Sequence, residues 1–93
     1  MIEEYSLEAG VSSSTLTRII RCESNFNPKA KNPNSSAKGL AQIIDGTWKH
    51  FKCEGEPLDA RDNIRCATKI LKDSVHHWDA SVMCHANLAK HAL

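Results

Sequence analysis

Four cysteines in a chain of 93 residues constrain its fold more than any other feature. A domain this small buries only a modest core, and such domains commonly depend on disulfides for stability. Four cysteines allow three pairings. A zinc site that uses Cys with His76, His77 or His85 is one alternative, and a reduced cytosolic protein is another. Because the chain has no Cys-x-x-Cys or His-x3-His pair, we expect two disulfides and no metal.

The charge balance excludes one class of partner. Twelve Lys and Arg oppose eleven Asp and Glu, which leaves a net charge of +1. Nucleic-acid binding needs a surplus of cations to neutralise phosphates, so we expect no nucleic-acid partner. No apolar run approaches the roughly 20 residues that span a bilayer. The first ten residues, MIEEYSLEAG, lack the pattern of a secretory leader, so an exported chain would have lost its leader or used another route.

The spacing of apolar residues predicts a small, mostly α-helical domain. Residues 1–13 form a mixed lead-in, and the domain is expected over 14–93. Asn27 to Gly39 is rich in Asn, Pro and Ser and is expected to be a loop. No period-2 stretch is long enough to predict a strand. Helices are expected at about 14–25, 46–52, 60–73 and 79–91.

Several polar residues stand where helix caps are expected. Ser12, Ser13 and Ser14 are candidate N-caps of the first predicted helix. Asp45 is expected to cap the second helix. Asp59, with Asp62 three residues later, resembles a capping box before the third.

Glu23 is the candidate for acid–base chemistry. It ends the apolar face that Leu16, Ile19 and Ile20 form, just before a polar loop. A carboxyl there would be partly desolvated, which raises the pKa of a carboxyl and favours a proton donor. On spacing alone a solvated Glu is the simpler interpretation.

The stretch ESNFNPKAKNPNSSAKGLAQIIDGTW, residues 23–48, resembles the signature of the soluble lytic transglycosylase family. The matching residues are Glu23, Ser24, Phe26, Asn27, Pro28, Gly39, Leu40, Gln42, Ile43 and Thr47. Ala41 replaces the usual Met of the family. A later element, DNIRCATKIL, is similar to the family's Asn-Ile helix at Asn63 and Ile64. Cys22 directly before Glu23, with Trp78 and Cys84, is similar to the resuscitation-promoting factors, which are secreted relatives.

The resemblance implies a monomeric, lysozyme-like domain that cuts the β-1,4 bond between N-acetylmuramic acid and N-acetylglucosamine in peptidoglycan, without a cofactor. Glu23 would protonate the glycosidic oxygen and then act as a base. If it activates the sugar's own 6-hydroxyl, the product is a 1,6-anhydro end. The implied substrate contacts are Ser24, Gly39, Gln42, Thr47 and Asn87. For Gly39 a tight turn is the alternative, and for Gln42 a solvent-facing amide.

The same resemblance implies a disulfide between Cys22 and Cys84, beside Glu23. That pairing leaves Cys53 with Cys66. Disulfides and a peptidoglycan substrate together indicate an extracytoplasmic protein, whether secreted, periplasmic or carried on a virion.

Some residues and activities are left open. Phe26, Ile43 and Trp48 are expected in the core, whereas Trp78 suits either the core or a sugar platform. Many relatives have a tyrosine near the C-terminus that orients the acid, but the closest stretch here, VMCHANLAK, has none. Muramidase-type hydrolysis therefore remains an alternative reaction. A non-catalytic peptidoglycan-binding module and a disulfide-rich interaction protein are the alternatives to an enzyme.

Overall fold

The computed structural model of the protein describes residues 1–74 and 77–78. These residues form the helices α1 (Ile2–Ala9), α2 (Ser13–Ser24), α3 (Asp45–His50) and α4 (Ala60–Asp73). Within them the only β pairing consists of isolated bridges, such as the one between Lys38 and Ile43. The mostly helical fold class is therefore confirmed. The predicted helix at 79–91 lies outside the described residues. No described helix has the length and apolarity needed to cross a membrane.

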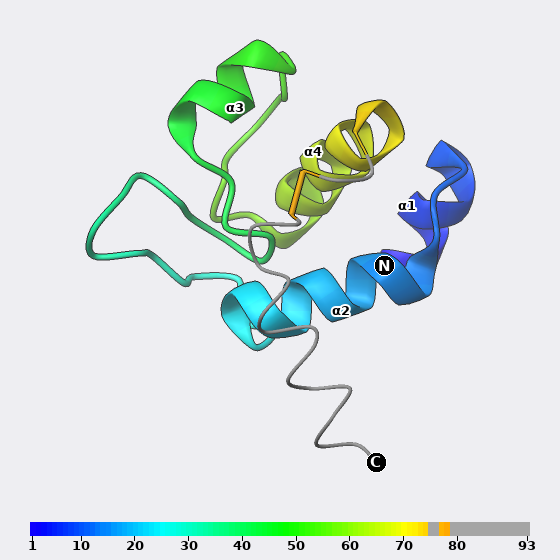
Figure 1. The fold of residues 1–93 in the computed structure, drawn as a ribbon, viewed down its shortest axis with the longest axis horizontal. Coiled ribbons are helices and arrows are strands. Elements are labelled where there is room, and N and C mark those ends of the chain that lie inside the picture. Colours follow the sequence, from blue (N-terminus) through cyan, green and yellow to red (C-terminus); the bar gives the residue numbers. More distant parts are fainter. Residues whose placement is uncertain (75–76, 79–93) are drawn as a thin grey trace.

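Helix α1 occupies the segment that the sequence analysis treats as a lead-in. It packs against both α2 and α4, on the side of the molecule where the N-terminus lies (Figure 1). Gly10 ends it in a left-handed conformation, φ 74°, which glycine adopts without steric cost. The spacing of apolar residues does not predict this helix, because the polar Ser6 is buried and the apolar Leu7 is 85% exposed.

The predicted caps define the starts of the two longest helices. The Ser12 hydroxyl accepts a hydrogen bond from the Thr15 amide at 3.2 Å, and the Asp59 carboxylate accepts one from the Asp62 amide at 3.0 Å. Each bond satisfies an amide that has no partner inside its helix. The bounds of α4 are those expected, and those of α2 differ by one residue at each end.

Asp45 does not cap α3 as the sequence predicted. It is the first residue of that helix, and Ile44 occupies the N-cap position without a side-chain hydrogen bond. The Asp45 carboxylate instead forms an ion pair with the Lys38 ammonium at 2.9 Å. A carboxylate in the first helical turn also interacts favourably with the helix dipole.

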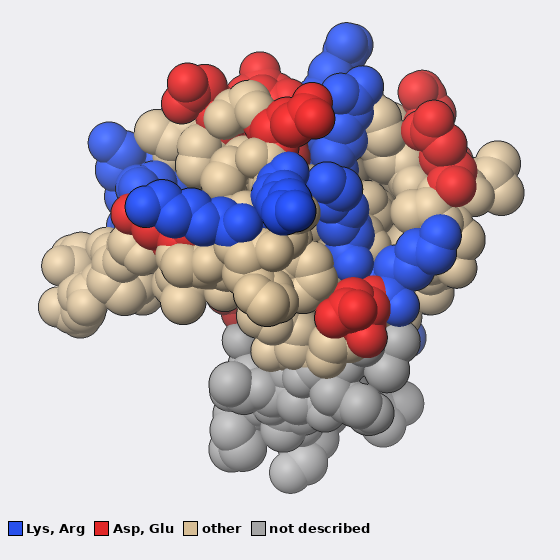
Figure 2. Space-filling view, turned by 90° about the horizontal axis from the view of Figure 1, so that it is seen from above, with Lys and Arg blue, Asp and Glu red and all other residues tan. Residues whose placement is uncertain are grey.

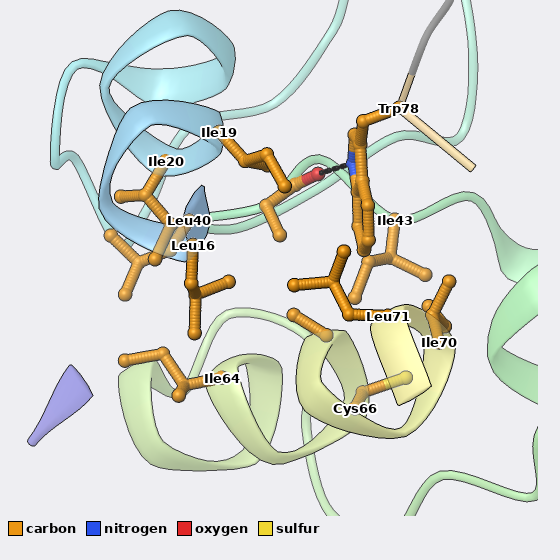
Figure 3. Packing of buried hydrophobic residues seen from close by; sticks show 12 residues of the cluster. Leu16, Ile19, Ile20, Leu40, Ile43, Ile64, Cys66, Ile70, Leu71 and Trp78 are labelled. Carbon is orange, nitrogen blue, oxygen red and sulfur yellow. Dashed lines mark hydrogen bonds between the residues drawn. The ribbon is translucent and has the colours of Figure 1, made fainter. Parts of the chain in front are cut away.

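The core lies between the apolar faces of α2 and α4, and the chain from Leu40 to Ile43 closes it (Figure 3). Ile43 is buried and Trp48 packs against the cluster from its edge, as predicted. The prediction for Phe26 was wrong, since its side chain is 43% exposed. The buried members are Leu16, Ile19, Ile20, Leu40, Ala41, Ile43, Ile64, Cys66, Ala67, Ile70, Leu71 and Trp78.

A disulfide joins Cys53 to Cys66, with the two Cα atoms 5.3 Å apart. It ties the segment that follows α3 to the middle of α4. Cys22 is also disulfide-bonded, but its predicted partner, Cys84, lies outside the described residues.

Candidate active site

Glu23 lies in the last turn of α2, and its side chain is half-buried. Residues three and four apart share one face of a helix. The side chain therefore follows Ile19 and Ile20, whose side chains are buried in the core. The apolar face of α2 thus ends at a carboxylate on the border between the core and the surface.

The chain leaves α2 through two consecutive left-handed residues. Asn25 has φ 52° and Phe26 has φ 63°, and a bulky side chain rarely adopts such a conformation. This reversal carries Phe26 out of the core. The Arg21 guanidinium lies 5.8 Å from the centroid of its ring, and the ring lines an apolar hollow of about 490 Å³ together with Leu40.

The loop after Phe26 returns to α2 as a hydrogen-bonded turn. Lys38 and Ile43 exchange two backbone hydrogen bonds, at 3.1 and 3.2 Å. Between them the backbone N–H of Gln42 donates to the Gly39 carbonyl at 3.2 Å. We call residues 39–43 the GLAQI turn. Leu40 and Ala41 pack in the same core cluster as Ile19 and Ile20 of α2, so the turn and the apolar face of α2 share one core.

Gln42 is anchored within this turn and is not simply solvated. Its side-chain nitrogen donates to the carbonyls of Gly39 at 2.9 Å and Ala30 at 3.1 Å. The Gly39 amide also donates to the Ala30 carbonyl, at 2.8 Å. These bonds use the donors of the Gln42 amide and leave its oxygen without a hydrogen-bond donor among the described residues.

Asn63 fixes the other side of the GLAQI turn. This fully buried α4 residue accepts a hydrogen bond from the Ala41 amide at 2.8 Å. Its side-chain nitrogen donates to the carbonyls of Pro57 at 2.8 Å and Lys38 at 3.1 Å. Gly39, with φ 78°, lies so close that a Cβ atom would meet the Asn63 amide and the Pro57 carbonyl. Gly39 therefore serves both the turn and a close backbone contact.

Trp78 holds the turn from a third direction. The side chain is 7% exposed and packs beside Ile19 (Figure 3). Its indole N–H donates to the Ala41 carbonyl at 3.0 Å. The structure therefore supports a core role for Trp78 and not the alternative role of a sugar platform.

Replacing Trp78 with Phe should cost about 1–2 kcal/mol of unfolding free energy, because a buried carbonyl loses its donor. Urea unfolding followed by circular dichroism measures this. Trp48→Phe is the matched control, since the half-buried Trp48 indole makes no hydrogen bond to a described residue. Equal losses in both variants would show that the Trp78 bond has no special importance.

Of the remaining predicted site residues, Ser24 and Thr47 lie in the described part of the chain. The Ser24 hydroxyl donates to the Ile20 carbonyl at 3.1 Å within α2. Thr47 is half-buried in α3. Asn87 lies outside the described residues. Sequence reasoning placed Asn63 and Trp78 in motifs but did not predict that both hold Ala41, because these are contacts between distant segments.

No three His, Cys, Asp or Glu side chains gather as a metal site in the described part of the chain. Glu23 is the acid–base candidate that the sequence selects, and Gln42 lies on the GLAQI turn.

Comparison with known families gives a direct match. The model of the transglycosylase SLT domain matches residues 1–89. No solved structure matches the chain.

Proposed function

Because this chain belongs to the transglycosylase SLT domain family, we propose that it cuts peptidoglycan glycan strands with Glu23 as the acid and base. Membership makes the chain a lysozyme-like enzyme of the lytic transglycosylase type that acts on peptidoglycan. The proposal adds the catalytic residue, the bond that is cut and the product.

The position of Glu23 carries the proposal. Its side chain is half-buried at the end of an apolar helix face, and the GLAQI turn packs in the core that this face helps to form. A general acid must reach an oxygen of its substrate, and a half-buried side chain at the border of the core allows this. Asp45, the next acid along the chain after Glu23, is exposed and paired with Lys38.

In the proposed reaction Glu23 acts first as an acid and then as a base. Glu23 gives its proton to the oxygen that links C1 of N-acetylmuramic acid to N-acetylglucosamine, and the C1–O bond breaks. The resulting carboxylate takes the proton of the 6-hydroxyl on the same muramic acid, while that oxygen bonds to C1. The product is a 1,6-anhydro end, and the acid is regenerated without consuming water.

This route explains why one carboxylate suffices. A retaining glycosidase ordinarily places a second carboxylate about 5 Å away as its nucleophile. Here an oxygen of the substrate closes the ring, so that no second acid is required. The 2-acetamido group of the sugar is a further internal nucleophile.

We propose that Gln42 contacts the glycan through its side-chain oxygen. Its nitrogen is already bonded to Ala30 and Gly39, which orients the amide and exposes the oxygen to a sugar hydroxyl or N–H donor. Ser24, Gly39, Thr47 and Asn87 remain proposed contacts by resemblance. Of these, Gly39 also has the structural role described above.

Hydrolysis of the same bond is the second candidate reaction. The position of Tyr5 favours it, because this tyrosine does not serve as the residue that orients the acid in many relatives. Tyr5 is the only tyrosine of the chain. It lies in α1 with the Arg65 guanidinium 5.2 Å from its ring centroid. It is thus engaged on α4, and another residue must orient Glu23. In a hydrolase Glu23 would activate water, and the product would be a reducing end.

The substrate and the disulfides favour a location outside the cytoplasm. Peptidoglycan lies outside the cell membrane, and disulfides such as Cys53–Cys66 persist in oxidising compartments. We propose that the chain acts there as a monomer.

Incubation with purified sacculi tests the proposed activity. We expect wild-type protein to release soluble muropeptides, which reversed-phase chromatography detects. Denatured protein is the control. Binding to the sacculi without any release would indicate a non-catalytic module and would contradict the proposal.

A further inference from the structure

A line of basic side chains follows the outer face of α4. Its members are Arg61, Arg65, Lys69 and Lys72, which we call the basic stripe. Steps of four, four and three residues place them on one helix face, and all are exposed. Ile64, Ala67, Ile70 and Leu71 occupy the opposite, buried face. The basic stripe therefore points away from α2 and from Glu23.

Basic side chains also gather on the molecular surface. Figure 2, seen from above Figure 1, shows a band of Lys and Arg side chains, with Asp and Glu side chains among and around them. The chain as a whole carries a net charge of only +1. The band is thus a local concentration of positive charge, and no general excess of cations explains it.

No member of the basic stripe forms an ion pair with an acid among the described residues. In the described residues the ion pair within 4.0 Å is Lys38–Asp45, and it lies elsewhere. Two members of the stripe are positioned by other groups. The Arg65 guanidinium stacks over Tyr5, and the Lys69 ammonium lies 3.4 Å from the Phe51 and Lys52 carbonyls. Such contacts restrict these side chains without cancelling their charge.

Two shallow hollows adjoin the stripe on either side of Lys69. Arg65 and Lys69 line one of about 200 Å³, together with Glu54 and the Cys53–Cys66 bridge. Lys69 and Lys72 line the other, of about 380 Å³, together with Phe51 and Asp73. Because the two hollows share Lys69, together they have three cations and two carboxylates and retain a small positive balance. Successive basic residues advance by about 4.5–6 Å along the axis of α4.

We propose that the basic stripe binds a linear polyanion of the cell envelope whose charges are phosphodiesters. Arg guanidinium groups match phosphate oxygens with two parallel hydrogen bonds. A polymer with a charge in every repeat suits closely spaced cations, whereas peptide stems present their carboxylates once per disaccharide. Because the stripe faces away from Glu23, this surface holds the envelope while the site on α2 remains open to a glycan strand.

The proposal is independent of the reaction and is tested by binding alone. The probe is soluble poly(glycerol phosphate), titrated into the full chain at low ionic strength and followed by calorimetry. The test variant is Arg61→Gln/Lys72→Gln, whose two residues make no side-chain contact that the fold requires. The matched control is Arg18→Gln/Lys31→Gln, which removes the same charge from exposed positions on α2 and the 27–38 loop. Circular dichroism checks that both variants fold.

We expect the stripe variant to bind the polymer about tenfold more weakly, since each exposed charge pair contributes modestly. The control should change less than twofold, and wild-type binding should weaken as salt is added. Equal losses in both variants would show that net charge alone is responsible and would overturn the proposal. So would tighter binding to a soluble stem peptide than to the polymer, or the absence of binding by the wild type.

Discussion

Glu23→Gln should slow the clearing of purified peptidoglycan by about 10²–10⁴-fold, which is the usual contribution of a general acid–base group. Glutamine keeps the size of the side chain but has no acidic proton to give to a glycosidic oxygen. Because Glu23 is half-buried at the end of α2, the isosteric change should leave the helix intact. The initial rate of turbidity loss measures the effect.

Glu8→Gln is the matched control for this experiment. Glu8 is exposed on α1 and makes no side-chain contact with a described residue. Its removal causes the same change of charge at a distance from the proposed site, and the rate should stay within about twofold of wild type. A Glu23→Gln protein that clears cell walls at the wild-type rate would remove Glu23 from the mechanism.

Gly39→Ala should destabilise the fold by about 3 kcal/mol or more, because two costs add. A left-handed conformation costs a non-glycine residue about 1–2 kcal/mol. The new Cβ would also meet the Pro57 carbonyl and the Asn63 amide, so the hydrogen bonds that hold Ala41 would have to move. Urea denaturation measures the loss, and activity should fall with it because the GLAQI turn would shift.

Two other glycines separate these costs. Gly10 has φ 74° with nothing near its added Cβ, so Gly10→Ala should show the conformational cost alone. Gly46 also has open space around its added Cβ and no positive φ. Gly46→Ala should therefore raise the unfolding free energy by up to about 1 kcal/mol, because alanine favours a helix. If Gly39→Ala costs no more than Gly10→Ala, the contact with Asn63 is not tight in solution.

The local signals of the sequence were enough to predict most of the helical frame. The hydroxyl of Ser12 and the carboxylate of Asp59 cap the helices they precede, since capping depends on neighbours in the sequence. The bounds of α4 follow from its apolar spacing. Helix α1 was missed because Leu7 is exposed and Ser6 is buried, which reverses the expected pattern.

The site was less predictable, because it depends on tertiary contacts. Motif spacing selected Glu23 and Gln42, but the bonds from Gln42 to Ala30 and from Asn63 to Ala41 join residues far apart in the chain. Phe26 shows the limit of the motif most clearly. Its place in the signature predicted a core residue, whereas the two left-handed residues after α2 leave the ring exposed.

If Glu23 makes the substrate's own hydroxyl close the ring, digestion of sacculi in ¹⁸O-labelled water should yield products without the label. Mass spectrometry of the released muropeptides should find 1,6-anhydro ends that contain no ¹⁸O, produced by wild-type protein and absent with Glu23→Gln. Reducing ends that carry ¹⁸O would show that water is the nucleophile and would contradict the transglycosylase mechanism.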